Sequence, residues 1–224
     1  MKFLTFDNLF DKNIHINRYK NLKRFDNNLY KILNNSCIID LTYTSVSLYR
    51  LYKIFYILNS SNVYISFIHS FNWNNDEFVN LLLKFTNNNI FNSKYWVKGI
   101  ITNEEILNNV IILGLWLNKF FVESNKSINI PFYINRIKNK VEYICSNLKF
   151  KNFSKFIFIF NFIADKQPLK ECLVSNKFIM GLCDLNFDVE ILDFFIYSNN
   201  INDISITFII KFIVCACINS HFNQ

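Results

Sequence analysis

Short, largely apolar runs separate longer segments of mixed polarity along this chain. The runs lie at residues 37–41, 63–68, 156–160, 178–183 and 194–197. Runs of this length with little polar interruption are typical of strands that are buried on both faces of a parallel sheet. We therefore interpret each run as a strand.

Between these runs, apolar residues recur at the spacing of an α-helix. The pattern predicts helices over residues 46–59, 76–85, 104–121, 136–150, 168–174 and 203–219. Strands that alternate with helices indicate an α/β fold, in which helices cover both faces of a parallel sheet. Ligands of such sheets approach the carboxyl ends of the strands, which we expect at Asp40, His69, the Lys98-Gly99 turn, Asp165 and Asp184.

Residues 1–35 lack a clear period and are polar, basic and rich in aromatic side chains. They predict an extended basic arm with one helix near residues 28–33. Residues 94–103 predict a short aromatic strand, a turn at Gly99 and the start of a helix. Thr102 or Asn103 is placed to cap that helix.

The amino-acid composition is strongly biased, but this bias does not indicate a fold. The chain holds 26 Phe, 3 Gly and 2 Pro among 224 residues, and Asn, Ile, Lys and Tyr are also abundant. AT-rich codons specify these residues, which indicates an organelle genome. No secretory or transit peptide is visible. The apolar stretches 156–164 and 204–218 are shorter than the roughly 20 residues that cross a bilayer, so we expect no membrane span.

The net charge of +7 is concentrated in two segments. Residues 12–31 carry six Lys or Arg against Asp26, and residues 136–155 carry six against Glu142. Two basic segments on a nearly neutral body favour a polyanionic partner, although solvated faces are the alternative.

Little in the sequence indicates catalysis. The six cysteines form no C-x-x-C pair, the histidines number three, and no glycine-rich phosphate loop is present. Asp184, Asn186 and Asp188 have oxygen ligands for Mg²⁺, but turn-forming side chains are the favoured interpretation. His69 is more simply a polar strand terminus than a base. We expect no enzyme activity, no cofactor and no metal, and we expect the cysteines to be buried and reduced.

Two motifs resemble a known family. Trp96, Gly99, Thr102 and Asn103 match the Trp-Leu-Gly-Gly-Met-Leu-Thr-Asn signature of the ribosomal protein S-two family, the universal second protein of the small ribosomal subunit. Residues 180–188 are similar to its Ile-Ala-Leu-Val-Asp-Thr-Asn-x-Asp segment. Shorter matches follow the family's order at residues 13–15, at 37–41 with Thr44, at Glu171, and at 193–196.

The resemblance implies a flavodoxin-like parallel sheet with helices on both faces and a shortened helical-hairpin insertion. It divides the chain into a basic arm (1–35), an α/β domain (36–103 and 151–224) and the inserted hairpin (104–150). It also implies a structural component of the small ribosomal subunit that binds rRNA near the head–body junction, among neighbouring small-subunit proteins and with no small-molecule substrate. We expect a mitochondrial ribosome, with a plastid ribosome as the alternative.

Candidate RNA contacts combine cations for phosphate with flat groups for exposed bases. The predicted contacts are Arg18, Lys20, Lys23 and Arg24 in the arm, Lys98 and Asn103 in the turn, and Arg136, Lys138, Lys140, Lys149 and Lys151 after the hairpin loop. A turn with a helix cap is the alternative for Lys98 and Asn103. Trp96 is better explained as a core residue than as a stacking platform.

Two other classes of function remain open. A degenerate Rossmann-like nucleotide-binding enzyme would bind a mononucleotide saturably. A subunit of a membrane complex would be extracted only with detergent.

Overall fold

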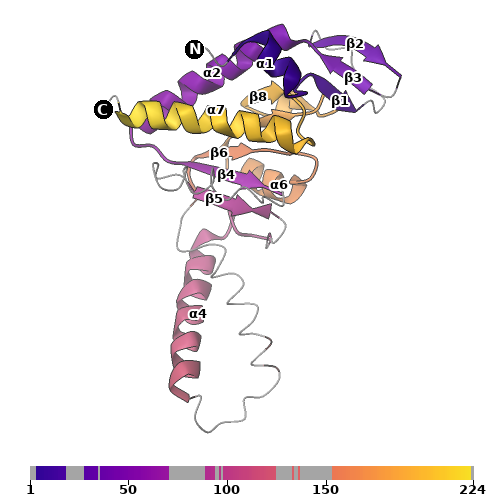
Figure 1. Ribbon diagram of the computed structural model, residues 1–224. Coiled ribbons are helices and arrows are strands. Elements are labelled where there is room, and N and C mark those ends of the chain that lie inside the picture. The colour runs from indigo at the N-terminus through magenta and orange to yellow at the C-terminus, as the bar shows by residue number, and fades with distance from the viewer. Residues whose placement is uncertain are drawn as a thin grey trace.

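The computed structural model describes residues 4–18, 28–34, 36–70, 89–93, 96, 98–124, 133, 136 and 153–222. Its centre is a five-stranded parallel sheet (Figure 1). The strands are β4 (Ile65–His69), β5 (Asn89–Asn92), β6 (Phe156–Ile159), β7 (Phe178–Cys183) and β8 (Phe194–Tyr197). Their spatial order, β5-β4-β6-β7-β8, is the flavodoxin-like order, so the predicted α/β fold class is confirmed.

Helices cover both faces of this sheet because successive strand residues point to opposite sides. In β4, Phe67 points into a core with α2 (Leu41–Ser60) and α7 (Asp203–Phe222), and Ile68 points into a second core. The second core includes α6 (Lys166–Val174). Asp40 caps the start of α2, because its Oδ1 accepts the Thr42 backbone N–H at 2.8 Å.

The helices α2 and α7 pack against each other along one face of the sheet (Figure 1). The Asn59 side chain on α2 donates to the Cys217 carbonyl at 3.0 Å and to Ser220 Oγ at 2.7 Å. By length and composition, α7 is the one helix in the described part of the chain that could cross a membrane. However, 56% of its apolar stretch is buried within the protein, which favours a core helix. The helix has 20 residues and is longer than the sequence pattern indicated.

The prediction for residues 1–41 is wrong in two respects. The expected arm with a helix near residues 28–33 instead contains α1 (Phe6–Asp11), β1 (Ile16–Arg18) and β2 (Leu29–Leu33). The apolar run 37–41, expected as a parallel strand, forms β3 (Ser36–Ile39) between β1 and β2 in a separate antiparallel sheet. An apolar run indicates burial but does not specify its partner strands, and here the partners come from the segment without a clear period.

The short aromatic strand expected before the Lys98-Gly99 turn falls mostly on residues 94, 95 and 97, which lie outside the described residues. Lys98 lies in a turn, as predicted, and the strand β5, which the sequence pattern did not indicate, ends at Asn92. The helix predicted after the turn is present as α4 (Glu104–Ser124), which extends away from the sheet (Figure 1). The short 3-10 helix η2 (Val189–Ile191) precedes β8. The helix predicted at 76–85 and most of the one at 136–150 lie outside the described residues, and the domain limits stay a prediction.

Cysteines in the described ranges are all free thiols. Cys37, Cys172, Cys183 and Cys217 are buried as predicted, and burial raises the pKa of Cys172 to about 12. Cys215 is exposed, contrary to the prediction, because it points away from Cys217 on α7. Cys145 lies outside the described residues.

Candidate nucleic-acid interface

The turn at residues 98–103 is held by one buried carboxylate. Glu171 on α6 is 6% exposed, and its Oε1 accepts the Trp96 indole N–H at 3.1 Å and the Gly99 backbone N–H at 2.8 Å. Its Oε2 accepts the Ile101 backbone N–H at 3.0 Å. One side chain therefore fixes the turn that leads from β5 into α4 against the body of the protein.

The fixed turn exposes Lys98 and Asn103. Gly99 has a φ of 92°, which L-residues rarely adopt, and its carbonyl accepts the Asn103 N–H at 2.9 Å. The Asn103 carbonyl accepts the Leu107 N–H at 3.1 Å, so the Asn103 backbone makes a hydrogen bond of the first turn of α4. The residue itself is exposed to solvent. Trp96 packs on Phe153 at the edge of the second core, as the core interpretation predicted.

Arg18 lies at the end of β1, on the antiparallel sheet. Its side chain is exposed, and its carbonyl accepts the Asn186 side-chain N–H at 3.1 Å. That bond ties the sheet to the loop after β7. The neighbouring Asp188 Oδ1 accepts the Glu190 N–H at 3.3 Å, so Asp188 caps η2. The bond of Asp188 favours its interpretation as a turn-forming residue, whereas Asn186 bonds the distant Arg18 carbonyl. The described residues hold no group of three or more His, Cys, Asp or Glu side chains that could bind a metal ion.

Sequence reasoning counted Lys31 among the cations of residues 12–31 but named neither it nor Tyr30 as an RNA contact; both lie on the same antiparallel sheet. Lys31 pairs with Ile38, which also pairs with Ile16, so these three side chains share one face. The next row, Arg18, Ser36 and Leu33, lies on the same face. Tyr30 is 72% exposed. The strand register could have revealed this grouping, but the register itself was not predicted.

A buried polar group lies at the carboxyl end of the parallel sheet. Asp165, just before α6, is 1% exposed and accepts a hydrogen bond from Ser93 Oγ, which also donates to the His69 carbonyl at 3.2 Å. Burial raises the pKa of Asp165, and hydrogen bonds from Ser93 and Ser70 act in the opposite direction without cancelling that effect. The group links β4, β5 and α6, and His69 lies 7% exposed at the end of its strand.

The predicted contacts that the structure describes do not form one patch. The antiparallel sheet with Arg18 lies at the opposite end of the molecule from α4, which follows the turn of Lys98 and Asn103 (Figure 1). Arg136 is exposed and helical. Seven predicted contacts lie outside the described residues: Lys20, Lys23, Arg24, Lys138, Lys140, Lys149 and Lys151.

A comparison with known protein families identifies the family of this chain. The family model of Ribosomal protein S2 matches residues 9–220, nearly the whole chain. The chain belongs to this family. A search of curated proteins finds no significant match.

Membership in the Ribosomal protein S2 family gives the chain a structural role in the small ribosomal subunit rather than an enzymatic one. The match spans both ends of the fold, from α1 to α7. It therefore includes the antiparallel sheet, the turn held by Glu171 and the loop that caps η2. The hydrogen bonds of Glu171 show that the two sequence segments that resemble the family, at residues 96–103 and around residue 171, are one structural unit.

Proposed function

We propose that this chain binds rRNA in the small subunit of an organellar ribosome. The observation that carries the proposal is the outer face of the antiparallel sheet, defined by Ile16, Arg18, Lys31, Leu33, Ser36 and Ile38. It presents two cations beside apolar side chains, and Tyr30, next to Lys31 in β2, is 72% exposed. Cations bind phosphates, and flat rings stack on unpaired bases.

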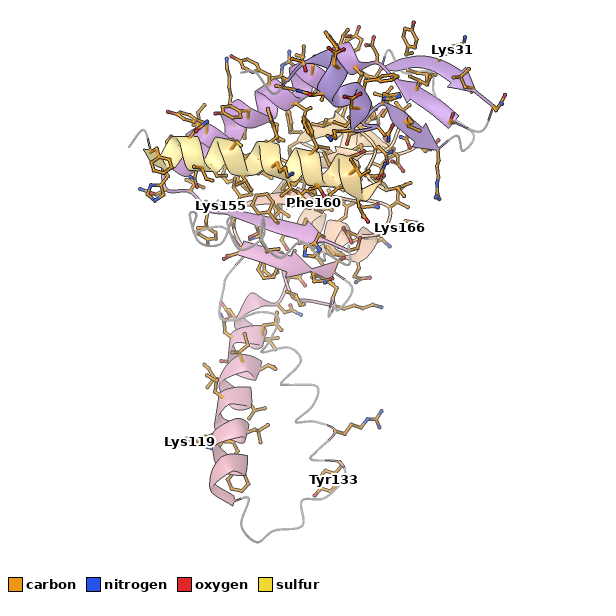
Figure 2. All side chains as sticks on the ribbon, in the orientation of Figure 1. Lys31, Lys119, Tyr133, Lys155, Phe160 and Lys166 are labelled. Carbon is orange, nitrogen blue, oxygen red and sulfur yellow. The ribbon has the colours of Figure 1, made fainter. Side chains whose placement is uncertain are left out.

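The segment that connects the two edge strands supports this assignment. Arg18 ends β1 and Leu29 begins β2, and these are the two edge strands of this sheet; residues 19–27 between them lie outside the described residues. That segment contains Lys20, Lys23 and Arg24 in sequence. Figure 2 shows Lys31 at the end of the molecule remote from α4. Arg18 and Lys31 thus belong to a surface that is separate from the turn at Lys98.

The turn at Lys98 is a second candidate contact. Lys98 and Asn103 are exposed on a turn that Glu171 holds, so an RNA contact there would meet a fixed backbone. Lys166 and Lys170, on the same helix as Glu171, are also exposed, and Figure 2 shows Lys166 at the surface of that helix. A contact near the head–body junction would use one or both of these surfaces.

Charge reversal tests the proposal. In the double variant Arg18→Glu/Lys31→Glu, we expect incorporation into small subunits to fall and its dependence on salt to become weaker, because each lost phosphate contact removes a cation that displaces counterions. The matched control is Lys53→Glu, an exposed cation on α2 that lies 4.6 Å from the Tyr49 ring. Incorporation is measured by sucrose-gradient sedimentation. Equal incorporation of the double variant and the control would contradict the proposal.

The organellar setting rests on composition. Phe, Asn, Ile, Lys and Tyr together reflect AT-rich coding, with 26 Phe against 3 Gly. We place the chain in the mitochondrial ribosome, with the plastid ribosome as the alternative. Immunodetection of the chain in ribosomes from purified mitochondria and plastids tests this, and detection only in cytosolic ribosomes would contradict it.

A further inference from the structure

The antiparallel sheet is attached to the rest of the protein in two different ways, of which the first is apolar. On its inner face, Cys37 and Ile39 of β3 belong to the second core, and Leu29 and Ile32 of β2 pack against that core. Apolar burial is favourable but has no preferred direction. It keeps the sheet on the body of the protein without fixing the position of each strand.

Along β1 the attachment is polar. Asn17, which pairs with Cys37, is 3% exposed, and the preceding His15 is 7% exposed. This segment runs beside the loops that follow β7 and β8 (Figure 1). In the described part of the chain, His15 Nδ1 and Asn17 Nδ2 make no hydrogen bond. The loops therefore hold this segment by its backbone, and hydrogen bonds of that kind are directional.

Asn199, in the loop after β8, holds the residues that lead into β1. It donates its backbone N–H to the Ile14 carbonyl at 3.0 Å and its side-chain N–H to the Asn13 carbonyl at 3.2 Å. Its Oδ1 accepts the backbone N–H groups of Ile201 and Asn202, both at 3.1 Å, just before α7. Asn199 therefore has a general structural role, because it joins three segments of the chain.

Asn186, in the loop after β7, has a narrower role. Its side-chain N–H donates to the Arg18 carbonyl at 3.1 Å, across 168 positions of sequence. Its Oδ1 makes no hydrogen bond with the described residues. Arg18 ends β1, is exposed, and is one of the two cations on the outer face of the antiparallel sheet. The bond of Asn186 thus acts on the residue that carries a proposed phosphate contact.

The position of the Arg18 backbone matters for such a contact. A guanidinium binds phosphate with two parallel N–H groups, so it needs a defined direction of approach. Without the bond from Asn186, the end of β1 could shift and carry the guanidinium out of that geometry. The apolar inner face would still keep the sheet on the body, because it does not involve Asn186.

We propose that Asn186 is a positioning residue for RNA recognition, which holds the Arg18 carbonyl and so fixes where the guanidinium meets phosphate. This inference rests on the proposed function and deepens it. It makes the RNA contact depend on an uncharged residue in a distant part of the sequence, which no pattern of charges could indicate.

A double-mutant cycle tests the positioning. Asn186→Leu keeps a similar side-chain shape and removes the N–H donor, and Arg18→Gln removes the cation. Each single variant and the double variant is co-expressed with the wild-type chain, and its share of assembled small subunits is measured by mass spectrometry. We expect each single variant to lose share several-fold. In the Arg18→Gln background, Asn186→Leu should change the share by less than about twofold, because two residues that act through one contact are not additive.

The salt dependence of release from small subunits gives a second readout. Arg18→Gln should weaken this dependence, because one cation fewer displaces counterions from phosphate. Asn186→Leu should weaken it as well, although the substitution changes no charge. A residue with a purely structural role would not act on the salt dependence in this way.

Asn219→Leu is the matched control. Asn219 is exposed on α7, and its side-chain N–H donates to the Tyr52 hydroxyl at 2.8 Å, so this substitution also removes one bond between distant segments. We expect the control to keep the wild-type share of small subunits and the wild-type salt dependence. The urea unfolding midpoints of Asn186→Leu and Asn219→Leu should agree.

The contrary outcomes separate this inference from the proposed function. Losses that add in the double variant, wild-type salt dependence of Asn186→Leu, or a urea midpoint well below that of the control would overturn the positioning alone. So would a wild-type share for Asn186→Leu. A wild-type share for Arg18→Gln would overturn the proposed RNA contact of Arg18 and the positioning with it.

Discussion

At the residue scale, Glu171 joins two separate parts of the sequence that both resemble the family. Its carboxylate accepts N–H groups from Trp96, Gly99 and Ile101, which lie on the other side of a long insertion in the sequence. The sequence placed Trp96 in the core and Gly99 in a turn, and both predictions hold. It did not predict the bonds between them and Glu171, because these depend on tertiary proximity that no local pattern encodes.

Replacing Glu171 tests the importance of these bonds. Glu171→Gln keeps one acceptor oxygen and sets an NH₂ group against a buried N–H donor. We expect a loss of about 1–3 kcal/mol in the free energy of unfolding, measured by urea denaturation. Glu105→Gln, on the exposed surface of α4, is the control and should change stability little. A loss no greater than that of the control would contradict the role of Glu171.

Asp165 makes stability depend on pH. Because burial raises its pKa in the folded state, the fold favours the protonated carboxyl. Its contribution to stability is therefore fully present below the unfolded value of 3.8 and is lost as pH rises through the folded value.

The variant Asp165→Asn removes this titration. From about pH 4 to about pH 7 the wild type should lose stability, because its buried carboxyl becomes charged, whereas the variant has no such group. The free energy of unfolding of the variant minus that of the wild type should therefore become more positive over this range. Denaturant unfolding of both proteins across this range measures the difference. A difference that does not change with pH would contradict the assignment.

At the element scale, four of the five strands of the parallel sheet were predictable, whereas β5 and the antiparallel sheet were not. The strands β4, β6, β7 and β8 are compact apolar runs that are buried almost throughout, which is the pattern that parallel strands produce. In contrast, β2 alternates irregularly and contains a register shift between Leu29 and Lys31, so its sequence has no clear period. The partners of β3 could not be identified without it.

The strand β7 depends on a glycine where it passes the loop after β6. A Cβ added at Gly181 would lie 2.1 Å from the Ile159 carbonyl oxygen and 2.6 Å from the Phe162 ring. Because backbone cannot move aside cheaply, Gly181→Ala should lower the free energy of unfolding by roughly 3 kcal/mol or more.

Gly99→Ala is the comparison for this prediction. The substitution creates backbone strain at a φ of 92°, but the nearest contact of the added Cβ is the Asn103 side chain, at 3.2 Å. We therefore expect a smaller loss of about 1–2 kcal/mol in the free energy of unfolding. Urea unfolding of both variants measures the order. A Gly181→Ala protein as stable as the Gly99→Ala protein would contradict the packing argument.

At the scale of the whole molecule, the chain joins an α/β body with two apolar cores to two outlying surfaces. The body is the part that sequence patterns predicted best, because burial of apolar strands and helices is a local property of the sequence. The surfaces are harder to predict, because they depend on strand register around Lys31 and on the bonds of Glu171 that hold the turn at Lys98. The predicted cations in residues 20–24 and 138–151 stay predictions, since they lie outside the described residues.

The most direct measurement is sedimentation of the native chain from lysed cells or organelles. The account predicts that the chain sediments with small ribosomal subunits, is released by high salt because phosphate contacts are screened, and is not released by detergent alone. Sedimentation apart from ribosomes, or release only by detergent, would contradict the central claim that this protein is a structural, RNA-binding part of the small subunit.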